Sequence, residues 1–166
     1  SHQDAPLMAR LADRVHVIAP DYPGFGHSSA PRSSHDGGHF VYTFDHLAGI
    51  TEAFLDAVGI NRFFVYVFDF GAPVGFRIAT RHPGRIRGVI GQNGNAYAAG
   101  LGPNMQPVVS PGPDRHAFNE QVKAVLSLDA TRAQHLDGVR DAGQVDPDTW
   151  TLDQHWMDQP GRGPIM

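Results

Sequence analysis

The sequence predicts an α/β protein, in which a partial doubly wound parallel sheet is followed by an α-helical segment. Three observations predict this class. Helical patterns and short apolar stretches alternate over the first part of the chain, as in parallel sheets covered by helices on both faces. The apolar run Phe63–Phe68 ends at Asp69, where a helical pattern starts. After Gly94 only helical patterns follow, behind a stretch rich in Gly and Pro.

The expected elements follow from local signals. In the first part we expect helices over 5–11, 43–58 and 72–82 and strands over 15–19, 63–68 and 87–92. Thr43 suits an N-cap and Gly59 a helix end. In the second part we expect helices over 115–128, 131–139 and 147–157. Asp146 and Pro147 are a favourable N-cap and first-turn pair for the last helix.

Polar residues lie at the expected strand ends. Asp21, Asp69 and Asn93 each come directly or almost directly after one of the three predicted strands. In open parallel sheets, ligands bind beyond the carboxyl ends of the strands. The sequence therefore predicts a functional site that contains these three residues.

Asp69 is the most informative of them. A carboxylate between a buried strand and a helix start, with Gly71 two residues later, suits the tight turn that presents a catalytic nucleophile. The positive end of the helix dipole favours negative charge there. The alternative interpretation is that Asp69 is an ordinary helix N-cap.

Composition narrows the function. The chain has 166 residues, 41% of them hydrophobic and 18% charged, which is typical of a globular protein with a buried core. A net charge of −4 argues against a nucleic-acid partner, and the absence of a long apolar run argues against a membrane span. The sequence has no cysteine and no paired metal-ligand motif among its ten histidines. We expect a cytosolic protein without metal or cofactor.

Three segments resemble the α/β-hydrolase fold family, in the branch of epoxide hydrolases and haloalkane dehalogenases. Residues 17–28 are similar to its strand and D-x-x-G-x-G-x-S loop. Residues 67–71, Val-Phe-Asp-Phe-Gly, are similar to its nucleophile elbow, and residues 79–90 to the elbow helix and next strand. The resemblance implies a partial hydrolase core over 1–97 and the start of a helical cap, or lid, over 98–166.

The resemblance also implies a mechanism. Asp69 would attack an electrophilic carbon and form an alkyl ester, which a histidine-activated water would hydrolyse. The backbone N–H of Phe70 would contribute to the oxyanion hole. Asn93, Trp150 and Trp156 are the substrate-pocket candidates; the two tryptophans have the alternative role of packing the cap.

The sequence departs from the family at several positions. None of its histidines suits the base, and Asn93 stands where some dehalogenases have their acid. Phe70 lacks the indole N–H that many dehalogenases have after the nucleophile. No tyrosine lies in 98–166 to protonate an epoxide oxygen. We therefore expect the base and acid outside these residues.

The expected function is hydrolysis of small apolar electrophiles, with epoxides slightly favoured over haloalkanes. The partners are a small-molecule substrate and water, with neither nucleic acid nor membrane involved. The start at Ser1 and the turn-like end at Met166 suggest a piece of a longer protein, which we expect to be inactive and poorly stable in isolation. The remaining alternative is a binding protein that keeps the fold without its chemistry. The sequence leaves the oligomeric state open.

Overall fold

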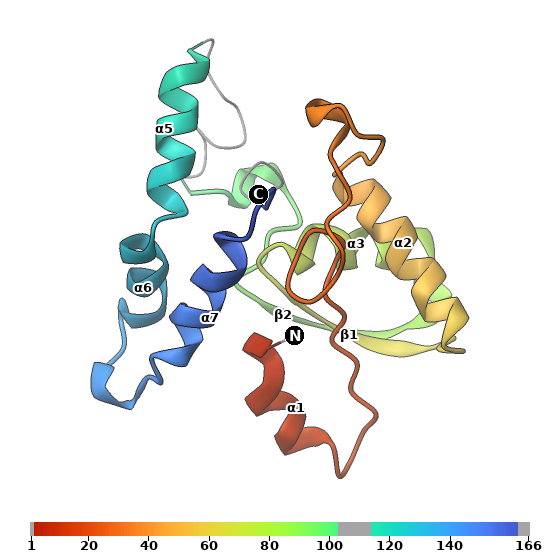
Figure 1. Ribbon diagram of the computed structural model, residues 1–166. Coiled ribbons are helices and arrows are strands. Elements are labelled where there is room, and N and C mark those ends of the chain that lie inside the picture. The colour runs from red at the N-terminus through yellow and green to blue at the C-terminus, as the bar shows by residue number, and fades with distance from the viewer. Residues whose placement is uncertain (1, 103–113, 163–166) are drawn as a thin grey trace. The chain divides into compact units, whose positions relative to one another are not determined.

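The computed structural model describes residues 2–102 and 114–162 (Figure 1). Its helices and strands are α1 (Ala5–Leu11), α2 (Phe44–Ala57), β1 (Phe63–Phe68), α3 (Gly71–Arg81), β2 (Ile86–Gln92), α5 (Arg115–Val125), α6 (Leu128–Leu136) and α7 (Asp148–Met157). Short 3₁₀ turns cover His2–Asp4, Ser34–Asp36, Pro83–Arg85, Ala98–Gly100 and Ala142–Gln144. The combination of helices with a parallel sheet confirms the predicted α/β class.

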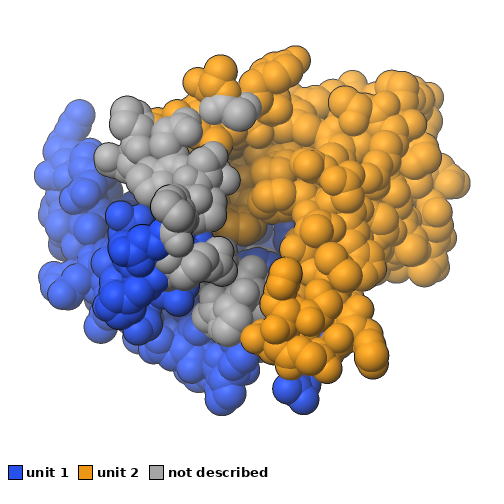
Figure 2. Space-filling model, turned by 90° about the horizontal axis from the view of Figure 1, so that it is seen from above, with its two compact units in different colours: residues 1–32, 110–166 blue, residues 33–109 orange. Residues whose placement is uncertain are grey.

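The chain divides into two compact units, coloured separately in Figure 2. Unit 1 comprises residues 1–32 and 110–166, and unit 2 comprises residues 33–109. Asp69 and Asn93 belong to unit 2, whereas Asp21 and both tryptophans belong to unit 1. The predicted division into a core over 1–97 and a cap over 98–166 stays a prediction.

Unit 2 is built around a β-α-β crossover. β1 is formed by the run FFVYVF, whose aromatic and β-branched side chains favour extended backbone. β1 and β2 run parallel, with Phe64 opposite Gly88 and Phe68 opposite Gln92. Helix α3 connects them, as a parallel pair requires. The predicted strand, helix and strand are confirmed to within one residue at each end.

The core of unit 2 lies between the strand pair and the two helices above it in Figure 1, α2 and α3. Its buried apolar residues are Leu47, Ala48, Leu55, Val67, Ala72, Val74 and Ile78. On the other face of the strand pair, Phe64 is 64% exposed and Ile90 is 56% exposed. Helices α2 and α3 therefore cover one face of the sheet. Their packing also holds the turn at the end of β1 in place.

Helix α2 begins and ends where the sequence predicts. The Thr43 hydroxyl accepts a hydrogen bond from the N–H of His46 at 3.2 Å, which satisfies a free donor of the first turn. Gly59, with φ of +73°, follows the last turn. Asp45 of α2 forms an ion pair with Arg77 of α3 at 3.2 Å, which links the two helices at their exposed side. Such exposed pairs contribute about 1 kcal/mol or less.

The predicted strand over 15–19 is wrong. These residues have no regular secondary structure, and Val15 is 53% exposed. Apolar side chains favour a strand, but a strand forms only where a neighbour completes its backbone hydrogen bonds. In the part of the chain that the structure describes, no segment pairs with 15–19. Asp21 therefore does not follow a strand, and only Asp69 and Asn93 remain at one sheet edge.

The helices of the second part are confirmed in type, with shifted boundaries. α5 ends at Val125, earlier than predicted, because Ser127 starts the next helix by accepting from the N–H of Ala130 at 3.3 Å. α7 begins within one residue of the predicted start, where Asp146 accepts from the N–H of Asp148 at 3.0 Å. Within the described ranges this part contains no strand, and no helix there or elsewhere is long and apolar enough to cross a membrane.

A shared carboxylate joins three segments of unit 1. Asp153 of α7 accepts a hydrogen bond from Gln3 Nε2 at 2.8 Å. The same carboxylate lies 2.7 Å from His2 Nε2 and 2.9 Å from His135 Nε2 of α6. The Asp153 side chain is only 13% exposed, so these partners compensate for the water that it has lost.

Candidate active site

The backbone at Asp69 has the conformation of a sharp strand-to-helix turn. Asp69 follows the last residue of β1 and precedes α3 by one residue, and its φ is +43°. Its carbonyl accepts a hydrogen bond from the N–H of Ala72 at 2.9 Å, which closes the turn. Left-handed backbone is uncommon outside glycine, and aspartate tolerates it better than most residues. Residues held in such conformations concentrate at functional sites.

Small residues let α3 pack close to the sheet behind this turn. A Cβ placed on Gly75 would lie 2.4 Å from Cγ1 of Val67, inside any possible contact distance. A Cβ placed on Gly94, just after β2, would lie 2.5 Å from the Cβ of Ala72. Ala72 itself is fully buried. Small residues are therefore needed where α3 packs against β1 and where the chain leaves β2.

The Asp69 carboxylate does not cap the helix. The N-cap position of α3 is Phe70, and no side chain makes a capping hydrogen bond there. By contrast, Thr43, Asp114 and Ser127 each cap their helices through a side-chain oxygen. Asp69 is exposed, and its carboxylate has no hydrogen-bond or ion-pair partner among the described residues. The N-cap interpretation is therefore wrong, and the carboxylate faces solvent at the positive end of α3.

Asn93 occupies the equivalent place on the neighbouring strand. It follows Gln92, the last residue of β2, and Gln92 pairs with Phe68 immediately before Asp69. Its φ is also +43°, and it is exposed. Within residues 2–102 and 114–162, Asp69 and Asn93 are the only non-glycine residues with positive φ. The predicted juxtaposition at the sheet edge is thus realised for this pair.

Phe70 packs against the start of α2. Its ring centroid lies 5.6 Å from that of Phe44, at an interplanar angle of 53°. The guanidinium of Arg77 lies over the same Phe44 ring at 5.6 Å, and Arg77 also donates to the carbonyl of Pro73 at 3.0 Å. Phe70 remains 42% exposed. An exposed apolar side chain therefore directly follows Asp69 in the chain.

The glycine loop around Asp21 is held together internally. Asp21 Oδ2 accepts from the N–H of His27 at 3.1 Å, and the Ser28 hydroxyl donates to the Asp21 carbonyl at 2.6 Å. A Cβ on Gly26 would lie 2.4 Å from the Asp21 carboxylate, which explains the glycine. Burial raises the pKa of Tyr22 in this loop to about 12. The contacts give Asp21 a role in loop structure.

Sequence reasoning missed Arg162, which fastens this loop to the end of the helical segment. Its Nη2 donates to the carbonyls of Gly26 and Ser28, at 3.2 and 2.9 Å. Arg162 is 8% exposed, and its Nη1 is buried without a hydrogen-bond partner. No local signal could have found it, because its partners lie more than 130 residues away in the sequence.

Both candidate tryptophans are half-buried in unit 1. The Trp156 ring meets His27 edge to face at 4.6 Å and lies 5.2 Å from His155. The Trp150 ring lies 6.4 Å from that of His135 and 5.9 Å from the guanidinium of Arg132. These contacts support the alternative that both rings pack the helical segment, while their role in a substrate pocket stays a prediction.

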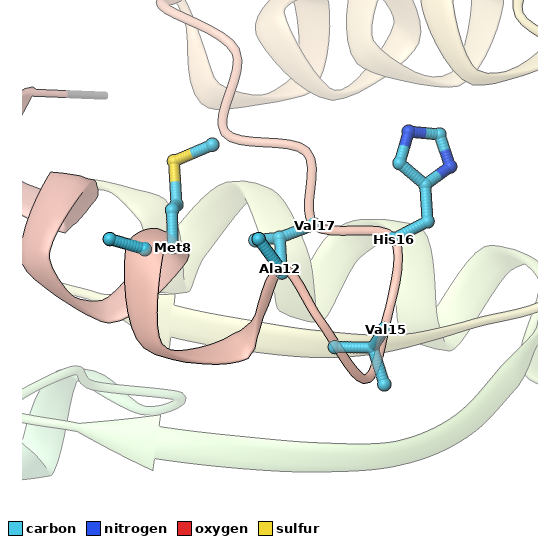
Figure 3. Close-up of a pocket in the computed structure, with 6 residues that line it drawn as sticks. Met8, Ala12, Val15, His16 and Val17 are labelled. Atoms are coloured by element: carbon cyan, nitrogen blue, oxygen red, sulfur yellow. The ribbon is translucent and has the colours of Figure 1, made fainter.

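Unit 1 also contains a shallow apolar recess between α1 and the segment that follows it (Figure 3). Its volume is about 310 Å³, and Met8, Ala9, Ala12, Val15, His16 and Val17 line it. In Figure 3 the His16 imidazole points away from Val15, as successive side chains of extended backbone do. None of the predicted site residues lines this recess. Among the described residues, no group of three potential metal ligands comes together.

Known proteins resemble this chain along most of its length. The sequence pattern of the α/β hydrolase fold matches residues 1–113. An uncharacterized hydrolase of Saccharomyces cerevisiae is 35% identical over 165 residues, which are 96% of this chain and 55% of the yeast protein. Haloalkane dehalogenase 2 of Mycobacterium tuberculosis is 33% identical over 84 residues, which are 51% of this chain and 27% of that protein.

Two solved structures share the fold. A probable hydrolytic enzyme of Pseudomonas aeruginosa superimposes with a TM-score of 0.67 at 26% identity, covering 98% of this chain and 49% of that one. Cfl2 of Burkholderia cenocepacia gives a TM-score of 0.72 at 17% identity, covering 99% and 56%. The chain thus spans about half the length of the longer relatives that it matches.

Proposed function

Since the chain belongs to the α/β hydrolase fold family, we propose that it is part of a hydrolase whose nucleophile is Asp69. This proposal rests on the carboxylate of Asp69, which is exposed and has no partner among the described residues. Its backbone is left-handed, between β1 and α3. A carboxylate that neither caps its helix nor pairs with a described side chain is available for chemistry.

In the proposed reaction, an Asp69 oxygen attacks an sp³ carbon of the substrate. A carbon–oxygen bond forms, the bond to the leaving atom breaks, and an alkyl ester of Asp69 results. A water molecule, deprotonated by the histidine that we expect outside these residues, then attacks the ester carbonyl. The histidine gives this proton to the departing alkoxide, which frees the alcohol product, and the Asp69 carboxyl group releases its proton to solvent and becomes a carboxylate again. The backbone N–H of Phe70, at the N-cap position of α3, is the proposed donor for the oxyanion that forms in this second step.

We propose small apolar electrophiles as the substrate class, either epoxides or haloalkanes. The exposed Phe70 ring beside Asp69 supports an apolar substrate. The Mycobacterium tuberculosis relative named a haloalkane dehalogenase supports the second group, although it aligns over only half of the chain. A cytosolic location, and Trp150 and Trp156 as pocket residues, remain part of this proposal.

The test is to trap the ester on the full open reading frame that carries these residues. We would mix the protein with an epoxide or a bromoalkane of the same carbon skeleton, quench early, and measure the mass of the peptide containing Asp69. We expect a mass increase that corresponds to the alkyl group for the bromoalkane and to the whole molecule for the epoxide, and that is absent in Asp69→Asn. Tight binding of these compounds without any adduct would instead favour a non-catalytic member of the fold.

A further inference from the structure

We propose that the side-chain amide of Asn93 donates a hydrogen bond to the leaving atom during attack by Asp69. The inference rests on the proposed function and assigns the group that accepts the developing negative charge. The need for such a group follows from Phe70, whose side chain has no polar hydrogen to offer. Asn93 is a polar residue at the same edge of the sheet, because it follows Gln92, the partner of Phe68.

The register of the strands brings Asp69 and Asn93 together. Phe68 and Gln92 are paired residues, so Asp69 and Asn93 each leave the sheet one step later, on neighbouring strands. Adjacent strands lie about 5 Å apart. The strand ends are also tied by side chains, because the Tyr66 hydroxyl donates to Gln92 Oε1 at 2.5 Å.

Packing on the other side of Asn93 keeps it beside the turn. Gly94 lies so close to Ala72, in the first turn of α3, that a Cβ on Gly94 would come within 2.5 Å of the Ala72 Cβ. The backbone after β2 therefore packs directly against the start of α3. A side chain that leaves the backbone at Asn93 originates next to the nucleophile.

The conformation of Asn93 is itself costly and is not explained by its contacts. Its φ of +43° belongs to the region that side chains rarely adopt, and asparagine pays less for it than most residues. Yet its amide has no hydrogen-bond partner among the described residues, and it is exposed. Glycine would satisfy the backbone at lower cost. An amide at this position is explained if it acts on a ligand.

The chemistry balances with Asn93 as a donor and not as an acid. Asp69 supplies the electron pair for the new carbon–oxygen bond, and the pair of the broken bond goes to the leaving atom. A halide departs as the anion, held by Asn93 Nδ2–H. An epoxide oxygen becomes an alkoxide that the amide stabilises until water protonates it. Removing one such donor costs about 10²- to 10³-fold in rate.

The experiment compares Asn93→Gly and Asn93→Asp with the wild type in single-turnover formation of the Asp69 adduct. Asn93→Gly removes the amide and keeps the freedom to adopt positive φ. Asn93→Asp keeps the size and offers only acceptors when ionised. The substrates are an epoxide and a series of chloro-, bromo- and iodoalkanes with one carbon skeleton. The melting temperature of each variant controls for folding.

We expect the rate loss to grow as the leaving group becomes poorer, from under about tenfold for iodide to about 100-fold for the epoxide oxygen. A structural role would instead slow all substrates by the same factor. An equal loss across the series, or no loss, overturns the role of Asn93 while the wild-type adduct upholds Asp69. If the wild type forms no adduct with any substrate, the proposed function itself fails, and this inference fails with it.

Discussion

Asp21 and Asp69 look alike in the sequence and differ in what surrounds their carboxylates. Each follows an apolar run, and each has glycines within a few residues. The Asp21 carboxylate accepts from the backbone of its own loop, at the N–H of His27. The Asp69 carboxylate accepts nothing from the described residues and sits at a helix start in left-handed backbone. One carboxylate builds structure, and the other is left available.

Aspartate therefore serves a structural role at position 21 and is left without a structural contact from the described residues at position 69. Glycine serves both sites, but for different reasons. Gly26 leaves room for the Asp21 carboxylate, whereas Gly75 leaves room for α3 to approach β1. In the loop the glycine accommodates the acid itself. At the elbow it accommodates the scaffold, so that the acid can project away from it.

The sharpest way to break this comparison is to neutralise each aspartate in the full open reading frame. Asp69→Asn removes the proposed nucleophile and keeps the size of the side chain and its tolerance of positive φ. We expect turnover of epoxide or haloalkane to fall by at least about 10³-fold with unchanged stability. Asp21→Asn should leave the turnover within about tenfold and lower the free energy of unfolding by about 1 kcal/mol. Equal loss of turnover in both variants would contradict the assigned roles.

Filling the space behind the elbow should destabilise the protein next most strongly. In Gly75→Ala the new methyl group meets the side chain of Val67, which is fully buried and has little room to move. We expect a loss of about 1–3 kcal/mol in the free energy of unfolding, measured by urea denaturation. The matched control is Gly49→Ala in α2, where nothing lies within 4 Å of the new group. That variant should gain about 0.5–1 kcal/mol from helix propensity.

Filling the glycine loop should have a smaller effect, because a flexible side chain is the obstacle. Gly26→Ala combines a φ of +47° with a clash against the Asp21 carboxylate, which must move and loosen its bond to His27. Gly37 has a φ of +76° and nothing within 4 Å, so Gly37→Ala is destabilised only by the unfavourable backbone conformation. We expect Gly26→Ala to be less stable than Gly37→Ala by about 1 kcal/mol. Identical urea midpoints for the two variants would show that the Asp21 side chain moves aside without loss of stability.

The smallest effect concerns the protonation of Tyr22. Its pKa is raised from 10.0 to about 12 by burial, so folding favours the neutral phenol. The stability that this shift contributes is fully present below pH 10 and is lost as the pH rises through about 12. The stability difference between wild type and Tyr22→Phe should therefore change only in this alkaline range. A tyrosinate absorbance titration that shows every tyrosine ionising near pH 10 would refute the shift.

Much of unit 2 could be predicted, because its signals are local. The aromatic and β-branched composition of Phe63–Phe68 predicts a strand there. Thr43 and Gly59 predict the two ends of α2. Asp69 could be singled out as a candidate because it stands between an apolar strand pattern and a helical pattern, with Gly71 two residues later. The sequence could not show that Asp69 does not cap α3, because a sequence does not reveal whether a side-chain oxygen reaches a backbone N–H.

The features that sequence reasoning missed depend on distant partners. Residues 15–19 have the side chains of a strand, but a strand needs a neighbour that the pattern does not contain. Arg162 donates hydrogen bonds to the carbonyls of Gly26 and Ser28, which are more than 130 residues away in the sequence. The left-handed turn at Asn93 was also missed, because asparagine is common in many loop conformations.

The left-handed turn at Asp69 has a consequence for how this lineage can diverge. Aspartate and asparagine both tolerate positive φ, and their codons differ by a single nucleotide. A descendant can therefore exchange the proposed nucleophile for an amide in one mutational step, without straining the backbone. The backbone does not resist this exchange, so under the proposed function only selection for the reaction would maintain the acid at this position.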